Sequence, residues 1–289
     1  MSAPSEAWNI RKVLTWTTQH FAAKAIDAPR LTAELLLAHV LVADRIRLYT
    51  DIERPLAGDE LTAYRALIQR RLAGEPTQYL TGVREFYGRP FSVDARVLIP
   101  RPETELLVDA CLAHLAKGVP SRTLDLCTGS GCIAVTIACE VPGASVLAVD
   151  VSAAACAVAR ENAEKHHAGS RVTVALGDLY AAVPPDARFD AVVSNPPYIA
   201  SHQLPTLQRE VRAEPSLALD GGPDGLTVVR RVVAGATGAL KAGGLLAVEI
   251  AEDQGAAVES LFREAGLIEV RVERDMARQN RLVLGKVAG

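Results

Sequence analysis

The sequence predicts an α/β fold, in which a Rossmann-like sheet of seven strands, the last one antiparallel, follows a small all-helical N-terminal domain. From about residue 105 onward, short apolar runs alternate with segments of helical periodicity, which is typical of a mostly parallel sheet covered on both faces. Residues 1–85 show helical spacing without strand alternation. The last two predicted strands, residues 268–275 and 280–287, leave no room for a helix between them, so we expect one of them to be antiparallel to its neighbour.

Two helices stand out in the N-terminal part. Residues 31–41 carry apolar side chains at helical spacing. Residues 58–74 form a second predicted helix, with Asp59 as its N-cap and Gly74 as its C-terminal stop.

The chain is expected to have three parts. Residues 1–85 form the helical domain, and residues 86–104 form a connector with short strands, because Gly, Pro and aromatic residues become frequent there. A hairpin is expected to turn at residues 87–90. Residues 105–289 form the α/β domain.

The α/β domain is predicted from the alternation of strand-like and helix-like segments along the sequence. The predicted strands are residues 121–128, 144–150, 171–178, 189–195, 244–251, 268–275 and 280–287. The predicted helices lie at about residues 131–140, 153–167, 225–241 and 253–265.

The composition excludes several classes of protein. The net charge of −3 gives no overall basic field for nucleic acid, and we expect none to bind directly. The five cysteines are odd in number and lack a CxxC spacing, which disfavours both a disulfide framework and a zinc site, so no metal is expected. Without a signal peptide or a long apolar run, the protein is expected to be cytoplasmic and to make no membrane contact. A monomer is also expected.

A glycine loop follows the first strand of the α/β domain. In TLDLCTGSGCIA (residues 123–134), Gly129 and Gly131 stand between a strand and a helix, where backbone N–H groups can approach a ligand. The next strand ends in Asp150, 19 residues beyond Gly131, a spacing suited to hydrogen bonds from ribose hydroxyls. This combination indicates a nucleoside cofactor.

Two cofactors compete for this loop. A dinucleotide needs GxGxxG, and Ala134 at the third position is tolerated by that fingerprint. Asp125 instead matches the DxGxGxG pattern of S-adenosylmethionine (SAM) methyltransferases, with Cys127 at the first glycine. Asp178 and Leu179, after the third strand, would suit an adenine pocket, although an ordinary turn explains them nearly as well. SAM is favoured narrowly on these residues alone.

The fourth strand ends in SNPPYIA (residues 194–200). Parallel strands place their carboxyl ends at one edge, so Asn195 is expected beside the cofactor. Pro196 and Pro197 have no N–H, which leaves the Asn195 side-chain oxygen and a carbonyl, that of Pro196, as acceptors for an –NH2 group. Tyr198 would supply a flat surface for a planar amide or base. The motif therefore favours methylation of an amino or amide nitrogen, against the simpler interpretation of a strand-ending turn.

These motifs resemble those of a known family, the N5-glutamine methyltransferases of peptide chain release factors (PrmC/HemK). The resemblance covers nearly the whole chain. It rests on TLDLCTGSGCIA and SNPPYI and on three further segments, which are GEPTQYLTG (residues 74–82), LIPRPETE (98–105) and EVRAEPSLALDGGPDGL (210–226).

The resemblance implies a helical substrate-recognition domain joined to a SAM-dependent methyltransferase domain. The implied substrate is the glutamine of the GGQ loop in class 1 release factors, which act in translation termination. The implied SAM site, together with the residues read from the pattern, comprises Asp125, Cys127, Thr128, Gly129, Ser130, Gly131, Asp150, Asp178, Leu179 and Asn195. The glutamine would be held by Asn195, Pro196, Pro197 and Tyr198, with Arg101, Pro102 and Glu103 walling the same cavity.

The chain departs from the family pattern at a few positions. Cys127 replaces a glycine, and Leu179 stands where many relatives have an aromatic residue, so both are expected to affect cofactor affinity more than reaction type.

Three other functions stay open at this point. A related enzyme could methylate a glutamine of a ribosomal protein, and a DNA or RNA amino-methyltransferase would share SNPPY. The latter should carry a basic recognition domain, whereas residues 1–85 hold 11 Lys and Arg against 10 Asp and Glu. A non-catalytic SAM-binding module is the third, and the intact SNPPY argues against it.

Overall fold

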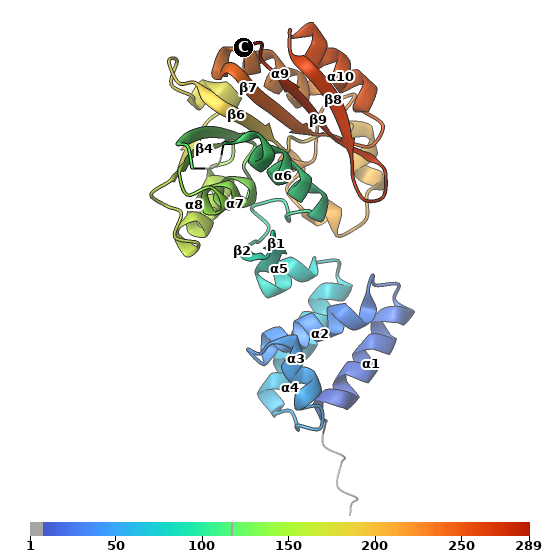
Figure 1. Ribbon diagram of the computed structural model, residues 1–289. Coiled ribbons are helices and arrows are strands. Elements are labelled where there is room, and N and C mark those ends of the chain that lie inside the picture. The colour runs from blue at the N-terminus through green and yellow to red at the C-terminus, as the bar shows by residue number, and fades with distance from the viewer. Residues whose placement is uncertain (1–7, 117) are drawn as a thin grey trace, which may run out of the picture. The chain divides into compact units, whose positions relative to one another are not determined.

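The computed structural model describes residues 8–116 and 118–289, and the chain divides into two compact units. The helical unit comprises Met1–Gly82 together with Arg209–Ala213, and the first seven residues of the predicted helical domain lie outside the described residues. The α/β unit comprises Val83–Gln208 and Glu214–Gly289 (Figure 1). No pattern in the sequence predicted that a segment from the second half of the chain belongs to the helical unit.

The helical unit is built from short helices around a small core. The helices are α1 (Ile10–Ala23), α2 (Pro29–Val40), α3 (Arg45–Thr50), α4 (Gly58–Leu72) and α5 (Thr77–Thr81). Leu14, Phe21, Leu36 and Leu37 are fully buried, and the hydroxyl of buried Tyr64 donates to the Ala33 carbonyl at 3.0 Å. Periodicity predicted α2 and α4, whereas α1, α3 and α5 were not predicted as separate helices.

The two ends of α4 differ in how well the sequence predicted them. Asp59 is not the N-cap, because the helix already begins at Gly58 and the Glu60 carboxylate accepts from the Ala57 N–H at 2.8 Å. Glu60 therefore does the capping from inside the first turn. Gly74 follows the helix with φ of +98°, the left-handed geometry that glycine supplies at helix ends.

A β-hairpin opens the α/β unit. Strands β1 (Val83–Phe86) and β2 (Arg89–Ser92) pair antiparallel, and the two residues between them, Tyr87 and Gly88, both have positive φ. Two such residues make the tight turn whose twist matches the strands. The turn is shorter than the predicted 87–90, since Arg89 and Pro90 already belong to β2.

The seven-stranded sheet has the order β5-β4-β3-β6-β7-β9-β8. Its strands are β3 (Ser121–Leu126), β4 (Ala144–Asp150), β5 (Val172–Leu176), β6 (Phe189–Ser194), β7 (Leu240–Glu249), β8 (Ile268–Arg274) and β9 (Asn280–Lys286). Neighbouring strands from β5 to β7 are parallel, and β9 is antiparallel to both β7 and β8. The predicted fold class, with its last strand antiparallel, is confirmed.

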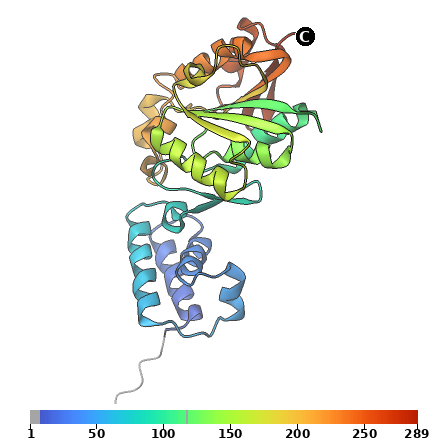
Figure 2. The same cartoon turned by 90° about the vertical axis from the view of Figure 1, so that its left-hand side faces the viewer.

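Helices cover both faces of this sheet, as the two views show (Figures 1 and 2). One apolar cluster joins the sheet to α6 (Glu105–His114), α7 (Cys132–Glu140), α8 (Ala153–Lys165) and the hairpin. The other joins it to α9 (Thr227–Ala239) and α10 (Gly255–Glu264). The sequence did not predict α6. Strand β7 begins at residue 240, earlier than the predicted 244, because α9 ends directly before it.

Among residues 8–116 and 118–289, no helix combines the length and the apolar character needed to cross a membrane. No group of His, Cys, Asp and Glu side chains in the same described ranges could hold a metal ion.

Candidate active site

The glycine loop between β3 and α7 has the backbone geometry that its residue types suggest. Gly129 and Gly131 have φ of +55° and +77°, and a Cβ at Gly131 would lie 3.1 Å from the Cα of Ala159 on α8. Glycine at 131 thus lets α8 pack closely against the loop. Cys127 also has a positive φ, +62°, which gives a physical reason for the glycine that the family pattern has there.

Asp150, at the end of β4, is tied to this loop. Its Oδ2 accepts from the Gly129 N–H at 2.8 Å and its Oδ1 accepts from the Ser152 N–H at 2.9 Å. Burial raises the pKa of Asp150, and these backbone donors work against the rise. The carboxylate is therefore held in a fixed orientation at the strand end.

Asp125 lies deeper in the protein than Asp150, beneath the glycine loop. It is fully buried in β3, and its Oδ2 accepts from the Thr128 hydroxyl at 2.6 Å. Burial raises the pKa of Asp125 to about 7, and the nearby Asp150 adds to the rise. Asp125 thus supports the loop from below through Thr128.

The SNPP segment leaves the sheet directly beside this loop. Ser194, the last residue of β6, is paired with Leu126 of β3, and its hydroxyl donates to the Leu126 carbonyl at 2.8 Å. Strands β3 and β6 lie where the strand order reverses, which is the place where sheets of this kind bind ligands. The Asn195 amide Nδ2 donates to the Thr104 hydroxyl oxygen at 3.1 Å.

Tyr198 is held at both of its polar ends. Its hydroxyl lies 3.5 Å from Oε1 of Glu249, and its carbonyl oxygen accepts from Nε2 of Gln254 at 2.9 Å. Burial raises the pKa of Tyr198, and Glu249 raises it further. The phenol stays neutral at physiological pH.

The strand ends and loops of the α/β unit enclose a cavity of about 300 Å³. The predicted site residues that line it are Cys127, Gly129, Asp150, Asp178, Leu179, Asn195 and Pro197. The cavity thus brings the glycine loop, the ends of β4 and β5 and the SNPP segment together around one space. Asp178 already pairs with Arg231 at 2.8 Å, and both side chains line the cavity.

Other predicted residues are not part of the cavity lining. Asp125, Thr128, Ser130 and Gly131 support the loop, and Pro196 and Tyr198 belong to the segment behind Asn195 and Pro197. Arg101, Pro102 and Glu103 do not line it either.

Arg101 is instead part of a structural pair. Its guanidinium lies 2.5 Å from Oε1 of Glu214, whose Oε2 accepts from the Ile99 N–H at 3.0 Å. Glu214 is buried, so this pair fixes the segment that follows the hairpin. A substrate contact by residues 101–103 stays a prediction.

Two segments of the cavity wall were not predicted from the sequence. These segments contribute Arg96, Val97 and Leu98 before α6, and Pro215, Leu217, Ala218 and Asp220 after the SNPP segment. The second segment lies inside EVRAEPSLALDGGPDGL, which the resemblance had singled out without assigning it a role. Loops without periodicity carry no signal that would have placed them at the site.

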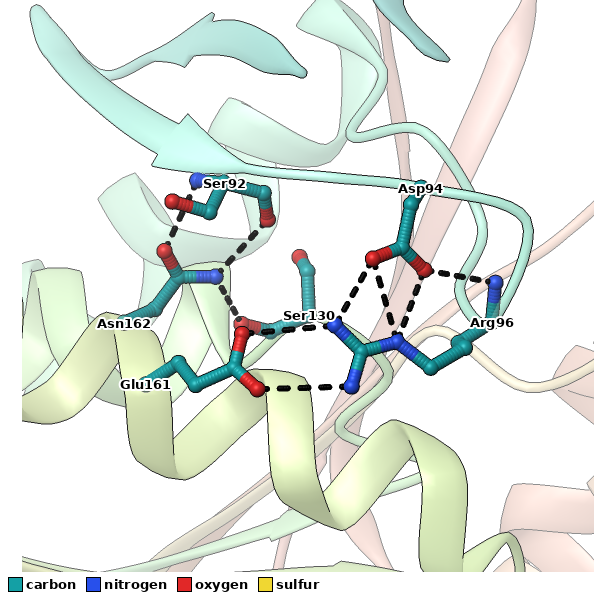
Figure 3. A network of polar contacts seen from close by, with 6 residues as sticks. All are labelled: Ser92, Asp94, Arg96, Ser130, Glu161 and Asn162. Carbon is teal, nitrogen blue, oxygen red and sulfur yellow. Dashed lines mark hydrogen bonds and ion pairs between the residues drawn. The ribbon is translucent and has the colours of Figure 1, made fainter.

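Asn162 of α8 connects Ser92, the last residue of β2, to the glycine loop (Figure 3). Its Oδ1 accepts from the Ser92 N–H at 2.8 Å, and its Nδ2 donates to the carbonyls of Ser92 and Ser130 at 3.0 and 2.9 Å. Figure 3 also shows Arg96 between Asp94 and Glu161 of α8. The cavity wall at Arg96 is thereby attached to the same helix.

Known proteins match this chain along most of its length. Residues 12–82 match the family PrmC N-terminal domain, and residues 103–222 match the family methyltransferase small domain. A release factor glutamine methyltransferase of Geobacter sulfurreducens is 42% identical over 99% of this chain and 100% of that protein. One of Chlorobaculum tepidum is 45% identical over 96% of each.

A solved structure supports the fold. A methyltransferase from Pyrococcus furiosus, 16% identical, superimposes with a TM-score of 0.53 over 78% of this chain and 98% of that one. The resemblance inferred from the motifs is confirmed by the sequence matches, which extend over both units. This chain belongs to the family of release factor glutamine methyltransferases.

Proposed function

We propose that this protein transfers the methyl group of SAM to the side-chain amide nitrogen (N5) of the glutamine in the GGQ loop of class 1 release factors. One observation carries the proposal. Asn195 and Pro197 of the SNPP segment line the same cavity as the glycine loop and Asp150. A nitrogen held at Asn195 would therefore share one enclosed space with a nucleoside cofactor.

The residues around the cavity fit SAM. A Cβ at Gly129 would meet no atom within 4 Å, so the backbone there faces open space that a ligand can fill. Asp150, with its fixed carboxylate, is suited to ribose hydroxyls, and Leu179 and Val149 give apolar walls for an adenine ring. When bound, SAM supplies a methyl group that is activated by the positive charge of its sulfonium.

The substrate amide would be gripped by oxygen acceptors. Because Nδ2 of Asn195 is engaged by Thr104, its Oδ1 is the amide atom left to accept from a substrate –NH2. Within the described part of the chain, no backbone N–H of a turn or loop donates to the Pro196 carbonyl, which would be the second acceptor. Two fixed acceptors stop the amide from rotating, and alignment of this kind is worth roughly 7–11 kcal/mol in favourable cases.

No strong base is required in this scheme. Methylation makes the amide nitrogen acidic, so its proton can leave afterwards to water. The protein's contribution is to bind, orient and shield the amide. The release factor would be recognised in part by the helical unit, which matches the PrmC N-terminal domain family, and the reaction would take place in the cytoplasm.

The proposal is tested by incubating the protein with methyl-labelled SAM and, in parallel, a class 1 release factor, ribosomal protein and DNA. We expect label only in the release factor, on the glutamine of its GGQ loop, as located by peptide mass mapping. Label in ribosomal protein or nucleic acid without label in the release factor would reject the proposal.

A further inference from the structure

Arg231 is a charged side chain of the cavity wall to which the proposed reaction gives no role. It lies on α9, and Val228, three residues earlier on the same face of that helix, lines the cavity as well. Nη2 of Arg231 lies 2.8 Å from Oδ2 of Asp178, which follows the last residue of β5 by two positions. The cavity wall therefore presents a guanidinium and a carboxylate side by side.

The backbones that carry these two side chains are fixed relative to each other. The hydroxyl of Tyr180, two residues beyond Asp178, donates to the carbonyl of Val232 at 2.6 Å. Val232 is fully buried, and a Cβ added to Gly235 on α9 would collide with the Tyr180 ring. Because α9 packs this closely on the residues after β5, the pair of Arg231 and Asp178 has a defined place in the wall.

The strand order puts this pair at one end of the cavity. Strands β5, β4, β3 and β6 are parallel neighbours in that order, so their carboxyl ends follow one another along a single edge. Asn195 follows β6, Asp150 ends β4, and Asp178 lies beyond β5. With the sulfonium of SAM at Asn195 and its ribose at Asp150, the base belongs at Asp178, at the end of the row opposite to Asn195.

The pair can reach a base and would read its edge. The side chains of Arg231 and Asp178 are 52% and 54% exposed, so a ligand in the cavity can contact both of them. A carboxylate only accepts hydrogen bonds, and a guanidinium only donates them. Adenine has a donating amino group beside an accepting ring nitrogen, whereas a 6-oxopurine such as hypoxanthine has an accepting oxygen in place of the amino group. The pair therefore matches adenine, and its carboxylate opposes hypoxanthine.

We propose that Arg231 is a specificity-determining residue, which together with Asp178 selects a cofactor with an adenine base over one with a 6-oxopurine base. The carboxylate accepts from the exocyclic amino group. The guanidinium donates to a ring nitrogen and holds the carboxylate in place. The inference rests on the proposed function, because it assigns the base-binding end of the same SAM site.

The test measures the calorimetric binding of S-adenosylhomocysteine and of S-inosylhomocysteine, the analogue whose base is hypoxanthine. The wild type should bind the adenine compound about tenfold more tightly or better. In Asp178→Asn this preference should fall to about twofold or less, because an amide can also donate to the hypoxanthine oxygen. In Arg231→Met the adenine compound should bind about tenfold more weakly and the preference should fall to about threefold, because the carboxylate can then turn away from that oxygen.

Arg230→Met is the matched control. Arg230 is the neighbouring residue on α9, and its guanidinium lies 2.5 Å from Asp224 in a pair that is about as exposed as that of Arg231. Arg230 does not line the cavity, so this variant should keep the wild-type affinity for both compounds. The ratio of the two affinities separates recognition from folding, because a damaged pocket would weaken both compounds equally and leave the ratio unchanged.

Three results would contradict the inference in distinguishable ways. A wild-type ratio in Arg231→Met would show that Arg231 does not read the base. Tight binding of both compounds by the wild type, without a preference, would overturn the inference and leave the proposed function standing. Binding of neither compound by the wild type would reject the SAM site itself, and with it the proposed function.

Discussion

Asn195 is the residue on which the proposed chemistry depends most directly. Asn195→Ala removes one of the two acceptors and leaves Pro197 and the glycine loop in place. We expect transfer to fall about 100-fold, on the scale of one lost transition-state contact. The measurement is the single-turnover rate with release factor, together with calorimetric binding of S-adenosylhomocysteine, which should persist. Near-wild-type turnover would contradict the role given to Asn195.

Asn162 should matter for stability rather than for chemistry. It is completely buried and makes hydrogen bonds to Ser92 and Ser130, so Asn162→Ala leaves buried backbone groups without partners. We expect the free energy of unfolding to fall by about 3 kcal/mol in urea denaturation. Glu161→Ala, one residue earlier, breaks only an exposed pair with Arg96 and should cost about 0.5 kcal/mol or less. Equal losses in the two variants would refute this assignment.

The buried Asp125 should make stability depend on pH. Its folded-state pKa of about 7 lies above its ordinary value of 3.8, so the folded protein binds more protons than the unfolded chain between these values. Stability is therefore lost as pH rises toward 7. From about pH 5.5 to about pH 8, the wild type should lose about 2 kcal/mol more than Asp125→Asn. Parallel stability curves for the two proteins would show that Asp125 is ionised throughout.

At the scale of secondary structure, the strands and the strand-end residues were predictable from sequence, while many side-chain contacts were not. Alternation located all seven strands, and parallel strands bring their carboxyl ends to one edge by geometry alone, so Asp150 and Asn195 could be expected together. Asn162 and Thr104 make their contacts with residues far away along the chain, at Ser92 and Asn195, and no local pattern encodes such a contact. The prediction of Asp59 as the N-cap was wrong for a local reason, because the neighbouring Glu60 carboxylate accepts the hydrogen bond at the start of the helix.

Two turns meet at Tyr198. One lies between β7 and α10, and the other lies before α9. Gly225 has φ of +75°, and a Cβ there would collide with the Tyr198 carbonyl and lie 2.7 Å from Nε2 of Gln254. Gly225→Ala should displace Tyr198 and lower kcat/KM about tenfold in the methylation assay. Gly238→Ala in α9, where an added Cβ meets no atom within 4 Å, is the control and should keep full activity. Comparable activity of the two variants would argue against this turn as a support for the site.

At the scale of the whole molecule, the helical unit is completed by Arg209–Ala213. Nη1 of Arg71, which is only 4% exposed, lies 2.7 Å from Oε1 of Glu210, and Arg209 donates to the Leu72 carbonyl at 3.3 Å. The short segment therefore neutralises a buried guanidinium on α4.

Glu210→Gln should destabilise the helical unit selectively. It leaves the buried Arg71 without a carboxylate and should lower the free energy of unfolding by about 2 kcal/mol, read from hydrogen exchange of the α4 amides. Glu75→Gln removes the partner of Arg70 in a largely exposed pair and should cost about 0.5 kcal/mol. Exchange rates that change equally in both variants would show that the Arg71 pair contributes no more to stability than the Arg70 pair.

Residues 209–213 belong to the helical unit although they lie far along the chain from its other residues, and this matters for protein engineering. Because the helical unit is assembled from two stretches of chain, it cannot be transplanted as one contiguous cassette. A chimera with only the first 82 residues taken from a relative would pair the relative's α4 with Glu210 of this chain. A compatible chimera would take both stretches from the same relative.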